Sequence, residues 1–210
     1  SFITDQEKQE EDILNSTDNI DVLENLLKNY NGCALKKTAT NFVKFQGNKN
    51  ADLLFIDGTP DKEEDKVGKS FVSAKGDLFE KMLNAIDLKK DDIFIVNAIP
   101  WRPPGNRYPT EEEIKICRPF IFNLIKLLRP KIIVCLGEIS TNQILHLNQS
   151  FIKTRGKWHS LKSNPINDFD EEYNPYVLPT LNISYLLTRP DMKRQAWEDM
   201  KLLRDKIREI

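Results

Sequence analysis

Three runs of apolar residues, each uninterrupted by a polar side chain, constrain the fold of this chain more than any other feature. They are residues 53–56, 93–96 and 132–136, and a weaker run follows at 176–178. A strand with one face in water alternates apolar and polar residues, so a continuous apolar run indicates a strand that is covered on both faces. The sequence therefore predicts a sheet that is buried between other layers.

Amphipathic segments separate these runs. Apolar residues recur at three- and four-residue spacing in 22–30, 78–86, 114–128 and 196–207, as expected of helices with one buried face. Thr110 and Glu113 have the spacing of a capping box, Asp21 can cap the first helix, and residues 42–45 suit an edge strand. This alternation predicts an α/β fold, a three-layer α/β/α sandwich with a central, mainly parallel four-stranded sheet. Ligands of such folds bind at the carboxyl ends of the strands.

The length and composition fit a single domain. The chain has 210 residues, of which 40% are hydrophobic, enough to bury a sizeable core. Residues 1–20 are polar and acidic, and we expect a loosely ordered leader there, followed by one domain over 21–210. No stretch has the length of a membrane span or the order of a secretory signal, and three cysteines do not make an even disulfide set. We expect a monomer in the reducing cytoplasm.

A neutral amide precedes a rigid basic loop at the end of the second strong strand. Asn97 follows residues 93–96, and the loop after it contains Arg102, Asn106 and Arg107 among prolines. An amide can donate to and accept from a base edge, while arginines suit phosphate oxygens. Because the formal net charge is only -1, any contact with nucleic acid has to come from such local clusters. The pattern indicates a protein that holds a nucleotide, although a plain proline turn fits this stretch equally well.

Five segments in order resemble the uracil-DNA glycosylase superfamily, and most closely its family 4, the iron–sulfur group of bacteria and archaea. The most specific segment is residues 63–72, EEDKVGKSFV, which is similar to the family's E-E-D-x-x-G-x-P-F-V. Asn97 with residues 102–110, RPPGNRYPT, is similar to N-x-x-K-C-R-P-P-x-N-R-x-P-T. Leu136-Gly137, Arg155-Gly156 and residues 184–187 complete the order. The resemblance covers roughly residues 21 to 205.

This resemblance implies a role for each matching residue. Phe71 would stack on an extruded uracil, Asn97 would read the base, and Glu64 would activate water or support the positive sugar in the transition state. One loop would push into the gap that the base leaves, and it comprises Ser184, Tyr185, Leu186 and Leu187. The loop from Arg102 to Arg107 would hold phosphates, and the DNA-binding residues would include Arg102, Asn106, Arg107, Arg155 and Arg189.

Both catalytic motifs of the family are altered in this chain. The first, G-E-A-P-G, reads DGTPD at residues 57–61, so Thr59 stands in the base pocket where the best-known glycosylase family has a water-activating Asp. Asp61 could supply the missing carboxylate, or it could narrow and charge the pocket. The second, H-P-S-Y-L-L, begins here with Asn182, a neutral donor that stabilises an anionic leaving base less than a His does. Asn at this place also resembles the mismatch-specific uracil glycosylases.

The cluster ligands of family 4 are also incomplete. The four cysteine positions read Cys33, Lys36, Trp101 and Cys117, and neither Lys nor Trp replaces a thiolate toward iron. We therefore predict no iron–sulfur cluster and no other metal. Trp101 would fill the vacated volume, and Cys33 and Cys117 would lie close together as relic ligands.

Three functions remain open at this stage. The first is a DNA-repair glycosylase that hydrolyses the N-glycosidic bond of uracil, or of another deaminated base, after flipping it out of damaged DNA. The second is a catalytically weak or inactive homologue of the same fold that binds DNA or a protein. The third is an enzyme with a changed substrate, because Asp61 could accept from an exocyclic amine that uracil lacks.

Overall fold

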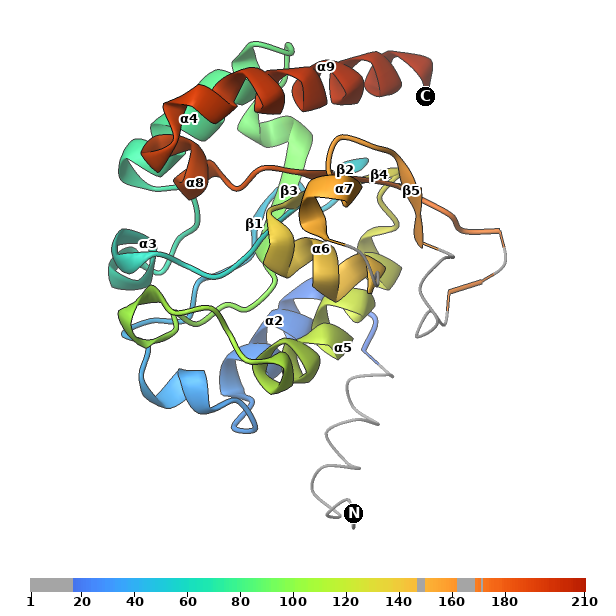
Figure 1. Cartoon of the computed structure of the whole chain (residues 1–210). Coiled ribbons are helices and arrows are strands. Elements are labelled where there is room, and N and C mark those ends of the chain that lie inside the picture. Colours follow the sequence, from blue (N-terminus) through green and yellow to red (C-terminus); the bar gives the residue numbers. More distant parts are fainter. Residues whose placement is uncertain (1–16, 147–149, 162–168, 171) are drawn as a thin grey trace.

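A computed structural model describes residues 17–146, 150–161, 169–170 and 172–210 of the chain (Figure 1). Its centre is a six-stranded sheet in the order β1-β3-β2-β4-β6-β5. The four middle strands are parallel, which confirms the predicted centre, and a short antiparallel strand extends each edge. The strands are β1 (Gln46–Gly47), β2 (Leu53–Asp57), β3 (Ile93–Asn97), β4 (Ile132–Leu136), β5 (His159–Ser160) and β6 (Tyr176–Thr180).

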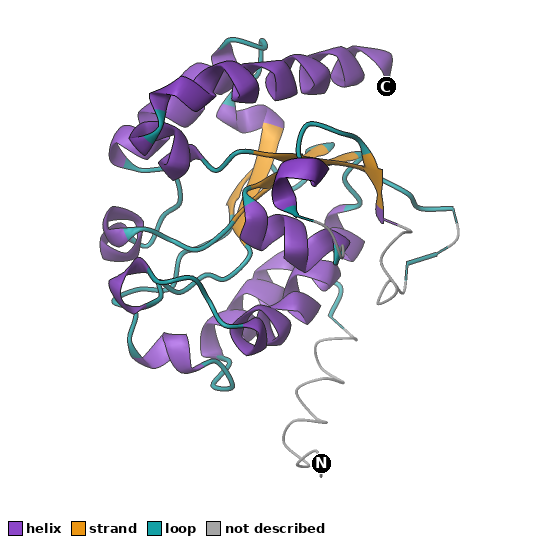
Figure 2. Cartoon of the chain, in the orientation of Figure 1, coloured by secondary structure: helices purple, strands orange, loops and turns teal. Residues whose placement is uncertain are grey.

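Helices cover both faces of this sheet (Figure 2). One layer contains α2 (Ile20–Asn29), α5 (Glu111–Leu128) and α6 (Glu138–Leu145), and the other contains α4 (Ser73–Asn84), α8 (Ile183–Thr188) and α9 (Lys193–Glu209). Two shorter helices, α3 (Lys62–Val67) and α7 (Phe151–Thr154), lie in the connections. The 3₁₀ turns are η1 (Ala34–Lys37), η2 (Lys90–Asp92), η3 (Pro104–Asn106) and η5 (Pro190–Met192).

The continuous apolar runs follow from this layering. Within β2, Leu54 and Ile56 pack on the α2, α5 and α6 side, whereas Leu53 and Phe55 pack on the α4, α8 and α9 side. Successive side chains of a strand point to opposite faces, so a strand between two helical layers needs an apolar residue at every position. All five residues of β2 are buried, and the same holds for β3 and β4.

Two local expectations were wrong, one held and one stays untested. Asn19, not Asp21, caps α2, because its extended backbone lets its side chain accept from the backbone N of Asp21 and Val22. The edge strand is Gln46–Gly47, because Val43 N and Lys44 N donate to loop carbonyls. The capping box of Thr110 and Glu113 is confirmed. Most of the predicted leader lies in residues 1–16, outside the described residues.

Among the described residues, no helix is both long enough and apolar enough to cross a membrane.

Candidate functional site

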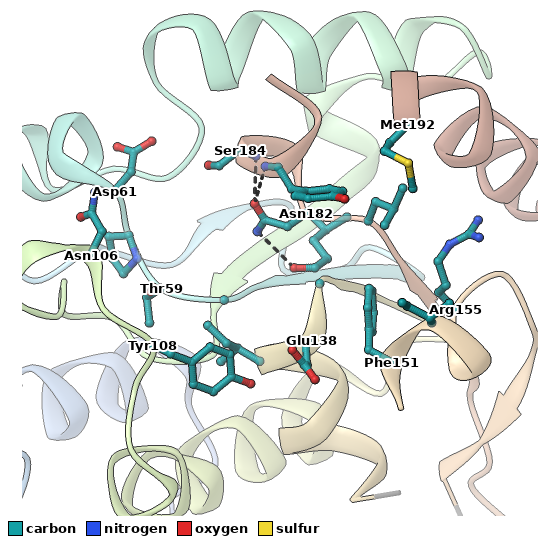
Figure 3. Close-up of a pocket in the computed structure, with 18 of the residues that line it drawn as sticks. Thr59, Asp61, Asn106, Tyr108, Glu138, Phe151, Arg155, Asn182, Ser184 and Met192 are labelled. Atoms are coloured by element: carbon teal, nitrogen blue, oxygen red, sulfur yellow. Dashed lines mark hydrogen bonds between the residues drawn. The ribbon is translucent and has the colours of Figure 1, made fainter. Parts of the chain in front are cut away.

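The candidate site lies where the four parallel strands end. Asp57 of β2 pairs in register with Asn97 of β3, and the turns that follow β4 and β6 reach the same edge of the sheet. A cavity of about 750 Å³ opens there. Figure 3 shows it extending from Asp61 and Asn106 at one end to Arg155 and Met192 at the other. The carboxyl edge of a parallel sheet is the usual place for a ligand.

Predicted residues from several segments meet around this cavity. The structure brings Thr59, Asp61, Asn106, Arg155, Asn182, Ser184 and Tyr185 to its wall. Aromatic and apolar side chains, among them Tyr108, Phe151 and Leu181, complete the lining. Such a mixture of apolar wall and few polar groups is typical of sites that hold a flat organic ligand.

Asp61 begins helix α3 and acts as its N-cap. Its Oδ1 accepts from the backbone N of Glu63 and of Glu64, at 2.9 Å each, and Glu64 Oε2 accepts from Asp61 N at 2.9 Å. This reciprocal capping box satisfies amide donors that a helix start leaves without partners. In the described part of the chain, no hydrogen bond is recorded for Asp61 Oδ2, so this oxygen remains available at the cavity wall.

Glu64 belongs to a buried cluster of charges with Asp57 and Lys75. Lys75 Nζ lies 2.5 Å from Asp57 Oδ2 and 2.8 Å from Glu64 Oε2. The exposed fractions of the three side chains are 2% for the lysine and 0% for both carboxylates. Glu64 Oε1 also accepts from the backbone N of Phe71 at 2.6 Å. The cluster thereby joins strand β2 to helices α3 and α4.

Burial and charge act in opposite directions on these groups. Burial alone would lower the pKa of Lys75, but the attraction of Asp57 and Glu64 outweighs it, so the pKa is raised and the ammonium stays charged. Burial raises the pKa of Glu64, and the neighbouring carboxylate of Asp57 adds to this effect while Lys75 opposes it. The single ammonium group of Lys75 thus forms ion pairs with two buried carboxylates.

Hydrogen bonds link Phe71 to Glu64 and Asn97 to Ser70, and we call these four residues the Asn97 corner. The Phe71 ring stacks on Phe79 with centroids 4.0 Å apart, and Phe71 has a φ of 53°. Gly76 permits this backbone, because a Cβ there would lie 2.1 Å from the Phe71 carbonyl oxygen. Asn97 Oδ1 accepts from the Ser70 hydroxyl, while its Nδ2 has no partner among the described residues and is fully buried.

Asn182 is held by several bonds. Its Oδ1 caps α8 by accepting from Ser184 N and Tyr185 N, and its Nδ2 donates to Leu136 O at 3.3 Å (Figure 3). The same Nδ2 also donates to Asp57 Oδ1 at 2.7 Å. The amide that would stabilise a leaving base is therefore engaged by the carboxylate of Asp57. Negative charge on Asp57 makes this bond a strong one.

The four arginines predicted to contact DNA each lie beside a carboxylate. Arg107 forms a bidentate pair with Glu113, and Arg155 donates to Asp199 at 2.6 Å. Arg189 pairs with Asp191 at 3.0 Å, and Arg102 lies 4.0 Å from Asp65 while it donates to Asn106 Oδ1. The pair with Arg107 lowers the pKa of Glu113. These contacts hold the loops in place in the absence of nucleic acid.

The segment predicted to enter DNA is helix α8 and its start. Tyr185 and Leu187 are 40% and 39% exposed, whereas Leu186 is fully buried against the core. Ser184 is half-buried at the cavity. Of the predicted segment, Tyr185 and Leu187 are therefore on the surface, whereas the expectation for Leu186 was wrong because its side chain packs in the core.

The cysteine corner, defined as Cys33, Lys36, Trp101 and Cys117, does not fit an iron–sulfur cluster that needs four thiolates. Trp101 is 2% exposed and packs edge-to-face on Phe42, and Lys36 Nζ donates to Asn31. The two thiols are close, as expected: a hydrogen bond from Cys117 lowers the pKa of Cys33 to about 7. The described residues contain no group of three or more His, Cys, Asp or Glu that could hold a metal ion.

Sequence reasoning missed Asp57, Ser70 and Lys75 as parts of the site. Asp57 ends an apolar strand, where a charged residue is costly to bury without a partner, and this was a usable signal. Lys75 gave no comparable signal, because a lysine on a helix is usually at the surface. Ser70 stands where the family motif has Pro, and only the structure shows its contact with Asn97.

Comparison with known proteins identifies the family whose sequences this chain resembles. The sequence profile of the uracil DNA glycosylase superfamily matches residues 45–201. A type-4 uracil-DNA glycosylase of Saccharolobus solfataricus is 33% identical over 195 residues, covering 90% of this chain and 87% of that protein. Those of Sulfurisphaera tokodaii and Thermotoga maritima are 35% and 31% identical, covering 82% and 87% of this chain and 78% and 91% of theirs.

Proposed function

This chain belongs to the uracil DNA glycosylase superfamily, and from that premise we propose that it hydrolyses the N-glycosidic bond of uracil, or of another deaminated base, in DNA. The observation that carries the proposal is the Nδ2 group of Asn97, a buried donor without a partner among the described residues. A buried polar group without a partner costs free energy, so its presence points to a ligand that supplies the acceptor. A base carbonyl is such an acceptor.

The residues around Asn97 support the same chemistry. A base flipped out of the duplex would lie against the Phe71 ring, which Phe79 already holds by stacking, and its edge would face Asn97. Glu64 holds Phe71 through its backbone N, and its carboxylate would support the positive charge that develops on the sugar in the transition state. Asp61 Oδ2 is the carboxylate oxygen at the cavity wall that would accept a proton from the attacking water.

We further propose that the protein acts as a monomer and without an iron–sulfur cluster. Two of the four ligand positions lack a thiol, and the thiols of the other two are hydrogen-bonded to each other. The cluster claim is tested by the absorbance of protein purified without oxygen. A brown, cluster-type spectrum would refute it.

One observation favours the rival function, a DNA-binding homologue with little or no turnover. Glu64 and Asn182 already have hydrogen-bond partners at each side-chain polar atom, and Asp61 has one oxygen committed to a helix cap. Groups satisfied in this way are well placed to hold a scaffold and less free to act on a substrate. The assay has to separate these two readings.

The deciding experiment measures base release from single- and double-stranded oligonucleotides that carry uracil, hypoxanthine or xanthine. Asp61→Asn is the informative variant, since Asn is as good an N-cap as Asp but cannot accept a proton. We expect the wild type to release uracil and Asp61→Asn to be slower by about 10²-fold or more, the usual contribution of general base catalysis.

Asp61→Ala serves as the matched control for the cap. It should lose the same activity as Asp61→Asn and also about 1 kcal/mol of the free energy of unfolding. DNA binding by the wild type without release of any of the three bases would contradict the proposed hydrolysis and favour the binding module.

A further inference from the structure

Ser70 contacts the base-reading amide and is buried with it. Its hydroxyl donates to Asn97 Oδ1 at 2.5 Å, and both side chains are almost fully buried, at 4% and 1% exposed. This is the one hydrogen bond recorded for the hydroxyl among the described residues. The family motif has Pro at this position, which has no hydroxyl, so the contact is a feature of this chain.

The orientation of the Asn97 amide decides which base edge it can match. A side-chain amide has a donor end and an acceptor end, and a rotation of half a turn exchanges them. Uracil presents a carbonyl beside a ring N–H, whereas cytosine presents an amine beside a bare ring nitrogen. The two bases are therefore complementary to opposite orientations of the same amide.

The Ser70 hydroxyl favours one of these orientations. In the structure Oδ1 accepts from Ser70, so Nδ2 is the end left to donate, and the second lone pair of Oδ1 remains for a ring N–H. After a half-turn, Nδ2 would face the hydroxyl, which would have to accept, and its own hydrogen would have no acceptor among the described residues. Leaving a buried donor without a partner is costly.

We propose that Ser70 determines base specificity: its hydroxyl fixes the Asn97 amide in the orientation that accepts uracil and rejects cytosine. The inference rests on one part of the proposed function, the recognition of a flipped base by Asn97, and does not depend on hydrolysis. Ser70 acts through Asn97 and is a positioning residue. The chemical consequence is discrimination against the normal base from which uracil arises by deamination.

The test measures binding, so that it does not depend on turnover. Single-stranded oligonucleotides carry one 2′-fluoro-2′-deoxyuridine or one 2′-fluoro-2′-deoxycytidine, in which the fluorine suppresses cleavage of the glycosidic bond. The measured quantity is the ratio of the two dissociation constants. We expect the wild type to prefer the uracil probe and Ser70→Ala to reduce this preference about tenfold, the usual effect of one buried hydrogen bond.

Two further variants keep the result interpretable. Ser140→Ala removes another buried serine hydroxyl, one that donates to Gly137 O within α6, and should leave the ratio as in the wild type. Ser70→Cys keeps a weak donor of similar size and should give an intermediate ratio, which also serves if Ser70→Ala does not fold.

The outcomes separate the inference from the proposed function. An unchanged ratio in Ser70→Ala, or a wild type that does not distinguish the probes, overturns the role of Ser70. If uracil is released from an oligonucleotide without fluorine and the ratio in Ser70→Ala is unchanged, the proposed function is supported and the role of Ser70 is refuted. A wild type that prefers the uracil probe, loses this preference in Ser70→Ala and releases no base supports the inference and refutes the glycosylase.

Discussion

The Asn97 corner and the cysteine corner both depart from the motifs of family 4, but they do so in different ways. In and beside the Asn97 corner, the departures are polar: Asp57, Ser70 and Asn182 are each hydrogen-bonded to another side chain of the site. In the cysteine corner, Trp101 is buried and packs on Phe42, and the thiols of Cys33 and Cys117 are hydrogen-bonded to each other. The first region keeps a polar group with which a ligand could form a hydrogen bond. In the second region, the side chains contact one another.

The difference lies in what each region leaves without a partner. The Asn97 corner retains a buried donor, Asn97 Nδ2, that has no hydrogen-bond partner among the described residues. The cysteine corner fills its volume with an indole that contacts Phe42. A buried polar group without a partner calls for an explanation, whereas a close-packed apolar interior needs none.

The largest expected effect follows from removing the cation of the buried cluster, because this cluster includes Glu64 of the first region. Lys75→Met leaves Asp57 and Glu64 buried without their counter-charge, and we expect a loss of about 3–5 kcal/mol in the free energy of unfolding. Lys49→Met is the control, because the Lys49–Asp21 pair is 48% and 71% exposed and should contribute less than about 1 kcal/mol. Urea unfolding measures both, and equal losses would show that the buried cluster is not held by charge.

The next largest effect concerns packing in the cysteine corner. Trp101→Ala opens a cavity in the core, and we expect a loss of about 3 kcal/mol, whereas Trp101→Phe fills most of the volume and should cost less than about 1.5 kcal/mol. Neither variant should alter the preference between uracil and cytosine probes. A changed preference would mean that the two corners are coupled.

The smallest expected effect concerns the rate at which the thiols of the cysteine corner are oxidised. Because the pKa of Cys33 is lowered to about 7, the thiolate forms as the pH rises through that value. From one pH unit below it up to this value, we expect the rate of Cys33–Cys117 disulfide formation in hydrogen peroxide to rise about fivefold with the thiolate fraction. Mass spectrometry follows the loss of two hydrogen atoms per chain.

One variant and the third cysteine of the chain serve as controls for that experiment. Cys117→Ala removes the partner and should abolish the product. Cys135 lies in β4, where burial raises its pKa, and should remain reduced throughout. A rate that does not vary with pH would contradict a thiolate mechanism.

The sequence was sufficient for the framework and insufficient for the contacts. Continuous apolar runs predicted the four parallel strands, because a strand covered on both faces has few alternatives, and the capping box at Thr110 was readable from two residues. The spacing of Asp61 and Glu64 is also that of a capping box. The resemblance assigned catalytic roles to both residues, so their role in capping helix α3 was not predicted.

Other parts of the site could not be predicted because they depend on tertiary structure. Lys75 is buried only because β2 and α3 bring Asp57 and Glu64 to it from different parts of the chain. The same holds for Ser70, whose partner is 27 residues away. Local patterns specify helices and strands, whereas these contacts arise when separate elements meet.

The pairing of the four arginines with carboxylates has a consequence for how fast DNA is found. With each cation beside an acid and a net charge of -1, the molecule projects little positive field toward a distant duplex. Association should therefore proceed near the unsteered rate of about 10⁵–10⁶ M⁻¹s⁻¹ and change little with ionic strength. The arginines would exchange carboxylate for phosphate only at contact, so the protein would reach DNA by diffusion without electrostatic steering.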